Sequence, residues 1–597
     1  MGGAATQSQG TGASEFLKIM GHGRIHIRPH LERDLTCAHF PLTDLGNAER
    51  WRVRYGDDFR FCDKIGWFMW DGRRWRLLSE EKDALPAEVM QSVFSTIRSI
   101  RNEAALIAAL GCEDPPNLMD SEERLAHFQT WAMQVSKEGW AELERAIRRS
   151  YPLDQDGEIS NECLDAINEA VEFVRECEIT DQAFETMPSR RKLWSDAIKG
   201  HAKMSEGAGK LGSVAKLARS FPGIAVEPDA FDADRMAINV LNGTLRLRRR
   251  NVERSAEERE QGKSRWKTEG WKVVKDPHRR EDLITKLAPV KYAQSAKSPN
   301  WDDFIEKVQP DEVMRRFLHQ WFGLSLTGDI SEQKLAFFYG SGRNGKGTAV
   351  EAVAHLAGDY AGSIPIESFL DNGIKRRGDQ ATPDLARLPG VRLLRVSEPE
   401  RNARMNEGLV KMVTGGDPVD ARHLNKGFFT YLPDFKMTIS GNHKPEIKDT
   451  SDGIWRRMQL VPWKVTVPAE EVDRDLPSKL KSEASGILNR LLAGLCDWRE
   501  HGLIEPEEVR MATAAYRDQS DELGRFLSDT CETGEDVRGR PMRVPAGELH
   551  EIYLAWCDQV GGSFWKIKGF KKAMQDKGFE QVKSDGVKWT GIALRDS

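Results

Sequence analysis

Between about residue 335 and residue 465, short and strongly apolar runs alternate with helical patterns and turn residues. The runs are too short for helices and resemble strands that are buried on both faces of a sheet. Helices that alternate with such strands usually cover a parallel sheet. The pattern therefore predicts an α/β fold for this part of the chain.

The segments before this region follow other patterns. Residues 59–78 place apolar and aromatic residues at short spacing around an Asp-Gly pair at 71–72, which predicts a β-hairpin. Residues 237–247 predict a second hairpin, with an Asn-Gly pair at 242–243 in its turn. Apolar residues spaced i, i+3, i+4 predict helices, which include residues 95–110 and 163–177.

Composition shifts along the chain suggest its domain organisation. The first 15 residues are mostly Gly, Ser, Ala and Gln and have little to bury, so we expect a tail without stable structure. Residues 248–283 are rich in Arg, Glu and Lys, and we expect a solvent-facing excursion there. The expected regions are a tail (1–40), an N-terminal region (41–295), an α/β core (296–500) and a C-terminal domain (505–597).

Composition excludes several classes of protein. Hydrophobic residues make up 39% and charged residues 30% of 597 residues, as in a globular chain. The net charge is −5, so a nucleic-acid surface would have to be a local basic patch. No apolar run is long enough to span a membrane, and the N-terminus lacks a secretory signal pattern. Eight scattered cysteines without a CxxC pair suit a reducing cytoplasm.

A glycine-rich segment follows the apolar run 335–339. Residues 340–346 have the pattern G-x-x-x-x-G-K, and a helical pattern comes next. Such glycines let several backbone N–H groups face one anion at a helix N-terminus, and the lysine adds a charge for the β- and γ-phosphates. We therefore predict that ATP phosphates bind to Gly340, Ser341, Gly342, Arg343, Asn344, Gly345, Lys346, Gly347 and Thr348.

The loop departs from the common pattern at one position. Gly347 occupies the place where Ser or Thr usually holds Mg²⁺, and Thr348 comes one residue later. Either Thr348 supplies the hydroxyl from a shifted register or water replaces it. Residues 391–400 form an apolar run that ends in Glu398 and Glu400. A carboxylate there can hold Mg²⁺ through water and polarise the attacking water, although surface acids at a strand end are the alternative.

Two later segments add groups that a nucleotide site needs. The apolar run in 435–445 leads to Asn442, whose amide can bind both a γ-phosphate and a water molecule. Arg456 and Arg457 stand directly before another apolar run. A guanidinium stabilises a transferring phosphoryl group, but a structural salt bridge is the alternative.

Taken in order, these segments resemble superfamily 3 helicases, and more closely the phage and plasmid replicative helicases related to the poxvirus and satellite-phage primase-helicases. The resemblance covers roughly residues 41–597. The motifs that carry it are TDLGNAER (43–50), GWFMWDGRRW (66–75), NVLNGTLRL (239–247), APVKY (288–292), FLHQWFGLSLTG (317–328), GSGRNGKGT (340–348), PDLARLPGVRLLRVSEPE (383–400), LVKMVTGGDPVDARHLNKGFF (409–429), SGNHKP (440–445) and WRRMQLVPW (455–463).

The resemblance implies a role for each element of the nucleotide site. The glycine-rich loop, including Lys346, corresponds to the Walker A loop of a P-loop NTPase, and Glu398 stands at the Walker B position. Asn442 corresponds to the sensor. Arg457 stands where the family has an arginine finger that acts on the nucleotide of a neighbouring subunit, with Arg456 as the alternative.

The same resemblance implies contacts with DNA. The segment 415–429 corresponds to the region that leads to a β-hairpin touching single-stranded DNA in the channel of a ring. Lys426 is the favoured contact, followed by His423 and Arg422. A cation there would bind phosphate without reading sequence, whereas a solvent-exposed basic hairpin is the alternative.

Residues 520–597 predict three helices and a two-stranded hairpin, which is the order of a winged helix. Residues 563–590 contain seven Lys against three acidic residues. The helix around 568–577 could enter a major groove, and the favoured contacts on it are Lys568, Lys571 and Lys572. A capping domain with a solvated lysine face is the alternative.

Together these expectations describe an ATP- and Mg²⁺-dependent helicase of a mobile element. We expect a homo-oligomeric ring, which the resemblance implies is a hexamer. It would translocate on single-stranded or forked DNA in a bacterial cytoplasm and contact origin duplex through the winged helix. The alternatives are a bifunctional primase-helicase, an initiator that uses ATP only as an assembly switch, and a transport or packaging ATPase.

Overall fold

The computed structural model describes residues 29–79, 84–110, 188–261, 264–371, 382–401, 403–422, 427–448, 452–536, 538–560 and 565–595. Contacts within the chain divide it into two compact units. The first unit comprises the residues up to Ala233 together with Arg279–Thr285, and the second comprises Asp234–His278 and the residues from Lys286 onward.

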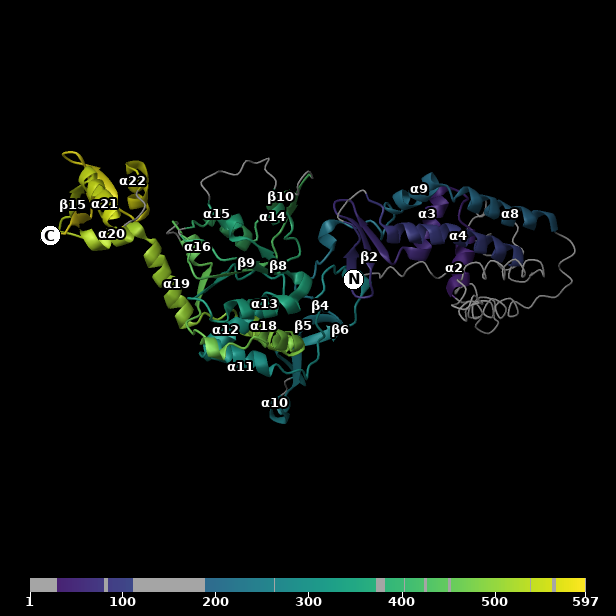
Figure 1. Ribbon diagram of the computed structural model, residues 1–597, viewed down its shortest axis with the longest axis horizontal. Helices are drawn as coiled ribbons and strands as arrows, with labels where there is room; N and C mark the ends of the chain where they lie inside the picture. Colours follow the sequence, from purple (N-terminus) through teal and green to yellow (C-terminus); the bar gives the residue numbers. More distant parts are fainter. Residues whose placement is uncertain are drawn as a thin grey trace. The chain divides into compact units, whose positions relative to one another are not determined.

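The first unit combines helices with a small antiparallel sheet (Figure 1). Its strands pair in the order β1-β2-β3, and Trp70 lies opposite Trp75 across the turn at 71–74. The Asp71 carboxylate accepts hydrogen bonds from backbone N–H groups of this turn. The hairpin predicted at 59–78 is therefore confirmed. The elements of this unit are α2 (Pro29–Ala38), α3 (Asp44–Tyr55), β1 (Phe59–Cys62), β2 (Gly66–Trp70), β3 (Trp75–Leu77), α4 (Ala87–Leu110), α8 (Pro188–Met204) and α9 (Ala208–Ala218).

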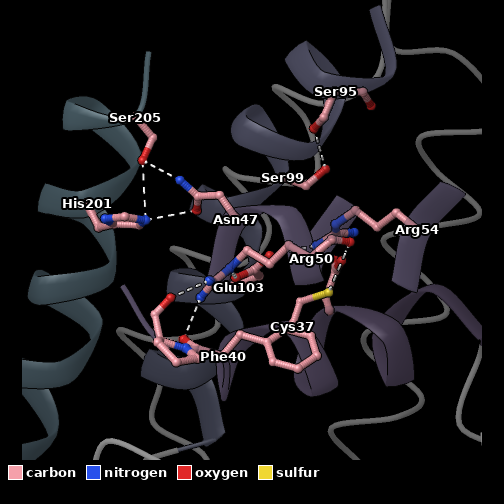
Figure 2. Close-up of polar contacts among 12 residues, drawn as sticks. Cys37, Phe40, Asn47, Arg50, Arg54, Ser95, Ser99, Glu103, His201 and Ser205 are labelled. Atoms are coloured by element: carbon pink, nitrogen blue, oxygen red, sulfur yellow. Dashed lines mark hydrogen bonds and ion pairs between the residues drawn. The ribbon is translucent and has the colours of Figure 1, made fainter. Parts of the chain in front are cut away.

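A buried ion-pair network holds α2, α3 and α4 together (Figure 2). The Glu103 carboxylate accepts a hydrogen bond of 2.8 Å from Arg50 Nε and another of 2.8 Å from Arg54 Nη2. Glu103 and Arg50 have fully buried side chains, and Arg54 also pairs with Asp34 at 2.5 Å. Burial raises the pKa of the Asp34 carboxyl, and Arg54 acts in the opposite direction. Each charge in this network is compensated by a partner, so the loss of one side chain would leave another charge buried without a counter-charge.

Two expectations for the N-terminal part need correction. The tail expected over 1–40 is wrong for its last part, because α2 begins at Pro29 and both Cys37 and Ala38 are fully buried. The helix expected at 95–110 is confirmed but begins earlier, at Ala87. The helix expected at 163–177 lies outside the described residues.

A five-stranded parallel sheet forms the centre of the second unit (Figure 1). The strand order is β13-β7-β12-β9-β8, and every neighbouring pair is parallel. The mixed α/β architecture with a parallel sheet is thus confirmed. The strands are β7 (Leu335–Tyr339), β8 (Ala361–Ile364), β9 (Leu393–Val396), β12 (Lys436–Gly441) and β13 (Met458–Pro462).

Each face of this sheet has its own layer of covering elements. Ala336 and Phe338 face a core formed with the helices of one layer, whereas Leu335 and Phe337 face the other layer. Burial on both faces explains why the strands are continuously apolar. The first layer contains α11 (Pro299–Val308), α12 (Glu312–Leu324), α13 (Lys346–Ala357), α17 (Leu476–Ser482) and α18 (Ala484–His501), and the second contains α14 (Pro383–Ala386), α15 (Glu407–Gly415), the hairpin β10 (Val419–Arg422) and β11 (Phe428–Tyr431), α16 (Asp452–Trp455) and α19 (Glu507–Ser520).

Residues 234–278 form an antiparallel sheet that belongs to the second unit. It consists of β4 (Ile238–Val240), β5 (Gly243–Glu253) and β6 (Trp266–Asp276), with the short helix α10 (Ala256–Glu260) between β5 and β6. The predicted β4–β5 hairpin is confirmed. Most described residues of the expected solvent-facing excursion at 248–283 are exposed, and the segment contains the end of β5, α10 and the whole of β6. The ring centre of Trp271 lies 4.3 Å from the guanidinium carbon of Arg249 and 5.1 Å from that of Arg499. The expected boundary at residue 295 therefore does not coincide with the compact units.

The C-terminal part of the second unit contains the three predicted helices and, after them, the predicted hairpin. Two short strands that were not predicted lie between the first and second helices, and one of them pairs with the hairpin. Its aromatic core joins Phe526, Tyr553, Phe570 and Trp589. The elements are α20 (Glu522–Thr530), β14 (Cys531–Thr533), β15 (Arg543–Pro545), α21 (Ala546–Val560), α22 (Ile567–Asp576), β16 (Glu580–Lys583), β17 (Val587–Thr590) and β18 (Ile592–Leu594). None of the helices in the described ranges has both the length and the apolar character that crossing a membrane requires.

The buried network gives a test of the first unit. Replacing Glu103 by Gln should lower the free energy of unfolding by about 3–5 kcal/mol, because it leaves Arg50 buried without a counter-charge. Chemical denaturation of the two proteins measures this difference. The control is Glu206→Gln, which removes the exposed pair with Arg101 and should cost less than about 1 kcal/mol. Equal costs for the two variants would contradict the role given to the network.

Candidate functional site

The residues predicted for nucleotide chemistry gather mainly at one edge of the parallel sheet. Tyr339 ends β7, and the loop 340–345 leads from it into α13. Glu398 follows β9 by two residues, and Asn442 directly follows β12. Since the strands are parallel, all three points lie at the carboxyl edge, where open α/β sheets bind ligands.

Glycines give the loop 340–348 its shape. Gly345, which caps α13, has a φ of 80° and Gly342 a φ of 96°, both in the left-handed region. A Cβ atom on Gly340 would lie 2.3 Å from the Trp463 carbonyl oxygen, so only glycine fits there. Arg343 adopts the left-handed region without being glycine, with a φ of 47°. The backbone therefore curls tightly before α13 begins.

Lys346 is largely buried and lies at the centre of the site. Its ammonium donates hydrogen bonds to the Gly340 carbonyl oxygen at 2.8 Å, to Asn344 Oδ1 at 3.0 Å and to Asn442 Oδ1 at 3.2 Å. The Glu398 carboxylate in turn accepts hydrogen bonds from the backbone N–H of Asn442 at 2.5 Å and from its side-chain amide at 3.4 Å. The structure thus connects Lys346, Asn442 and Glu398 in one chain of contacts.

The electrostatic state of Lys346 follows from these surroundings. Burial lowers the pKa of its ammonium below the ordinary value, and the charge of Glu398 acts in the opposite direction. The three oxygen atoms bonded to the ammonium belong to one backbone carbonyl and two side-chain amides, and none of them carries a charge. An anion at this position would supply the charge that these acceptors do not.

The residues predicted for Mg²⁺ have suitable chemistry for a hard cation. Thr348 lies in the first turn of α13, and the Glu398 carboxylate lies at the end of β9. Mg²⁺ is often bound by one or two protein oxygens together with nucleotide phosphates. Such a site does not need a cluster of protein ligands, and among the described residues no group of three or more His, Cys, Asp or Glu side chains forms one.

Arg456 and Arg457 lie at the opposite edge of the sheet from Lys346. The residue after Arg457, Met458, pairs with Leu335 at the start of β7, whereas Tyr339 pairs with Pro462. Five residues at about 3.3 Å each separate the two edges by roughly 15–20 Å. Neither arginine can therefore reach the loop 340–348 of its own chain.

The two arginines differ in exposure. Arg457 is only 8% exposed, and its Nη1 donates to the Gly453 carbonyl oxygen at 2.6 Å. Burial lowers the pKa of Arg457, as does the charge of Arg456, while Asp417 raises it. Arg456 is exposed. Arg456 is therefore accessible from solvent, whereas Arg457 is not.

The predicted DNA contacts fall in two places. Arg422 ends β10, and its guanidinium lies 5.1 Å from the ring centre of Phe428 across the hairpin. His423 and Lys426 lie outside the described residues. Lys568, Lys571 and Lys572 are all exposed on α22. A cleft between α22 and the β16–β17 hairpin is lined by residues that include Lys571 and Lys583.

Sequence reasoning missed Lys444, two residues after Asn442. Its ammonium lies 5.0 Å from the ring centre of Tyr339 and 4.9 Å from that of Tyr516. The motif SGNHKP contained the signal, because Lys444 follows the sensor position closely. Its partners could not be found from the motif, since Tyr516 is 72 residues further along the chain.

Comparison with protein families adds independent evidence. Residues 48–310 match the family model described as "D5 N terminal like". The chain contains a D5 N-terminal-like region. That region ends between α11 and α12, so the match does not include the loop 340–348.

Relatives of the chain occur in large DNA viruses. It is 31% identical over 270 residues to "Putative helicase L207/L206" of Acanthamoeba polyphaga mimivirus, covering 42% of this chain and 28% of that protein. It is 28% identical over 251 residues to "Putative helicase 022R" of Frog virus 3, covering 39% and 26%. A match to "Putative primase C962R" of African swine fever virus has 23% identity over 274 residues, covering 42% and 27%. The matches thus span about a quarter of these relatives.

These findings confirm the predicted resemblance to viral proteins of the primase-helicase type. Among solved structures, "The apo structure of NrS-1 C terminal region (305-718)" is 13% identical and has a TM-score of 0.33, covering 51% of this chain and 77% of that chain.

The loop geometry gives a prediction that does not depend on the reaction. Gly345→Ala should lower the free energy of unfolding by about 1–3 kcal/mol, because the residue has a positive φ and its Cβ would lie 2.8 Å from Phe304. Gly347→Ala is the control, since its Cβ would meet open space in the first turn of α13. That variant should be neutral or slightly more stable. Thermal or denaturant unfolding distinguishes the two, and equal effects would contradict the described loop conformation.

Proposed function

We propose that this protein is an ATP-driven, ring-forming DNA helicase with a P-loop NTPase core of the superfamily 3 type. The observation that carries the proposal is the chain of contacts from Lys346 through Asn442 to Glu398 at the carboxyl edge of a parallel sheet. These are the three groups that phosphoryl transfer requires: a cation for the phosphates, an amide for the γ-phosphate and water, and a carboxylate for Mg²⁺ and the water.

The local charge supports ATP as the ligand. The Lys346 ammonium is bonded to neutral oxygens only, at the N-terminus of α13, where the helix dipole also favours an anion. A triphosphate would replace one or more of these acceptors and supply negative charge. Mg²⁺ would be held by the phosphates together with Glu398 and the Thr348 hydroxyl or water, and would neutralise charge on the transferring phosphoryl group.

The position of the two arginines supports the proposed ring assembly. Because neither Arg456 nor Arg457 can reach the Lys346 site of its own chain, we propose that one of them acts on the nucleotide of a neighbouring subunit. We assign this role to Arg456 because it is exposed, and we regard Arg457 as the residue that fixes α16 to β13 through Gly453. A homo-hexamer is the assembly we propose by analogy with the family.

The relatives named as helicases support a nucleic-acid substrate, and we propose that this substrate is DNA. In this proposal the β10–β11 hairpin contacts single-stranded DNA in the channel of the ring, with Lys426, His423 and Arg422 as phosphate contacts. The C-terminal helices and hairpin act as a winged helix, with the exposed lysines of α22 on duplex DNA. We place this activity in the cytoplasm of a host cell.

The relative named as a primase favours one second candidate, a bifunctional primase-helicase. A primer-synthesis assay on a single-stranded template separates the two functions. An initiator that uses ATP only for assembly would bind ATP without turning it over, and a packaging ATPase would move along duplex DNA without separating its strands.

The phosphate-binding role predicts the effect of removing Lys346. Lys346→Ala should reduce ATP turnover by at least about a hundredfold, because a cation that stabilises the transition state in a site with little water is lost. Circular dichroism should show an intact fold. Lys464→Ala, which removes an exposed lysine, is the control and should hydrolyse ATP normally. Turnover by Lys346→Ala at a sizeable fraction of the wild-type rate would refute the assignment of the loop.

If the nucleotide site is formed by residues of two neighbouring subunits, two inactive variants should complement each other when they are mixed. Arg456→Ala should bind ATP almost normally but hydrolyse it about 10³-fold more slowly. Mixed with Lys346→Ala subunits, which keep Arg456, it should regain activity at interfaces that pair an intact loop with an intact arginine. The parallel mixture with Arg457→Ala is the comparison. If only that mixture regains activity, Arg457 acts in trans instead, and if neither does despite co-assembly, no arginine of this pair acts in trans.

The lysine face of α22 predicts a salt-dependent contribution to duplex binding. Replacing Lys568, Lys571 and Lys572 together by Glu should weaken duplex binding and reduce the slope of log K against log salt by about 0.9 for each lost phosphate contact. ATP hydrolysis without DNA should not change, because these residues belong to the C-terminal helices. Fluorescence anisotropy over a salt series measures the slope, and an unchanged slope would mean that the lysines are only solvated.

A further inference from the structure

Two strand ends at the carboxyl edge carry the groups that meet around Lys346. Tyr339 is the last residue of β7 and directly precedes Gly340, the first residue of the loop. Gly441 is the last residue of β12 and directly precedes Asn442. Gly441 and Tyr339 are partners in the sheet register. The distance between Lys346 Nζ and Asn442 Oδ1 therefore depends on how these two chain segments continue beyond the sheet.

Beyond the sheet, Lys444 connects the two segments. It lies two residues after Asn442, yet its ammonium lies over the ring of Tyr339 at 5.0 Å from the centre. A cation held against an aromatic face in this way contributes about 0.5–2 kcal/mol, more when it is removed from water. The Lys444 side chain is half-buried, and this burial lowers the pKa of its ammonium.

Helix α19 completes the surroundings of Lys444. The ammonium also lies 4.9 Å from the ring centre of Tyr516 and donates a hydrogen bond of 3.0 Å to Gln519 Oε1. Tyr516 is 4% exposed, and its hydroxyl donates to the carbonyl oxygen of Pro445, the next residue after Lys444. Its ring packs edge-on against Trp455 at 5.2 Å.

The helix itself is fixed to the sheet by separate contacts. The backbone N–H of Leu460 in β13 donates to Thr513 Oγ1 at 3.0 Å, and Arg517 pairs with Asp452 at 2.7 Å. Tyr516 and Gln519 therefore belong to a helix, α19, whose position relative to β13 is fixed by these contacts. Tyr516 and Gln519 are thus held in place beside the Lys444 ammonium.

We infer that Lys444 is a positioning residue for the proposed ATP hydrolysis, which holds Asn442 at hydrogen-bonding distance from Lys346 by bridging Tyr339 and α19. We call this set of contacts the Lys444 brace. The inference rests on the proposed function, since it assigns a role within that reaction. Lys444 does not touch the reacting atoms; it acts through Asn442, and Tyr516 and Gln519 act through Lys444.

The Lys444 brace should affect kcat for ATP hydrolysis and leave KM nearly unchanged. Loss of a positioning contact displaces Asn442 from the γ-phosphate and the attacking water, and a displacement of about 1 Å can cost a hundredfold in rate. ATP itself would still be bound by the loop 340–348. Lys444→Ala should therefore lower kcat for ATP about ten- to hundredfold while KM stays within about threefold.

The experiment compares Lys444→Ala with Lys444→Arg and Lys464→Ala in the full-length protein. Arginine can also lie over the two rings and donate to Gln519. The arginine variant should therefore recover at least half of the decrease in log kcat that the alanine variant shows. Lys464 is the matched control because it also pairs with α19, through Glu508 at 3.3 Å, but its side chain is exposed. Its removal should leave both kinetic constants unchanged.

The outcomes separate the brace from the proposed function. A kcat for Lys444→Ala within twofold of the wild type, or an arginine variant as slow as the alanine variant, would overturn the brace. Absence of ATP hydrolysis in the wild type would instead overturn the proposed function. If Lys444→Ala does not fold, Gln519→Ala takes its place, because it removes only the hydrogen-bond acceptor. It should lower kcat about three- to tenfold at unchanged KM, and an unchanged kcat would overturn the brace.

Discussion

The hydrogen bond between Lys346 and Asn442 is the interaction on which the rest of the site depends. It joins the first residue of α13 to the residue after β12, and it exists because β7 and β12 are neighbours in a parallel register. A register shift of one residue would turn the strand side chains to the other face and move the strand ends apart. The sheet order and the site chemistry are thus consequences of the same pairing.

Burial of charge recurs in both units but is resolved in different ways. In the first unit, Arg50 and Arg54 share the carboxylate of Glu103, so the charges compensate one another. In the second unit, the Lys346 ammonium is bonded to neutral oxygens. A compensated network stabilises a fold, whereas an ammonium without a bonded counter-charge favours binding of an anion. This contrast is why we place the function at Lys346 and not at Glu103.

Local patterns predicted much of the fold. The continuous apolar runs predicted buried parallel strands, and Asp-Gly and Asn-Gly pairs predicted both hairpins, because these signals depend on neighbours in sequence. The ribbon formed by β5 and β6 was missed because its residues are highly charged, and the strands are held by Trp271 packing against Arg499, more than 200 residues away. The buried helix α2 was missed for a similar reason, since its polar residues pair with α3.

The candidate site could be predicted as residues but not as geometry. The motifs pointed to Lys346, Glu398 and Asn442, which the structure brings together, and also to Arg457, which it buries at the far edge. Whether an arginine is exposed depends on contacts such as that with Gly453, which no local pattern encodes. Lys444 likewise gains its surroundings from α19.

The central claim is that this protein encircles DNA and separates its strands with energy from ATP. Electron microscopy of the purified protein with forked DNA and a non-hydrolysable ATP analogue tests it most directly. The account predicts a closed ring with nucleotide between adjacent subunits, next to Lys346 of one and Arg456 of the other, and a single DNA strand in the channel. Monomers bound to the fork, or a ring around duplex DNA with both strands in the channel, would contradict it.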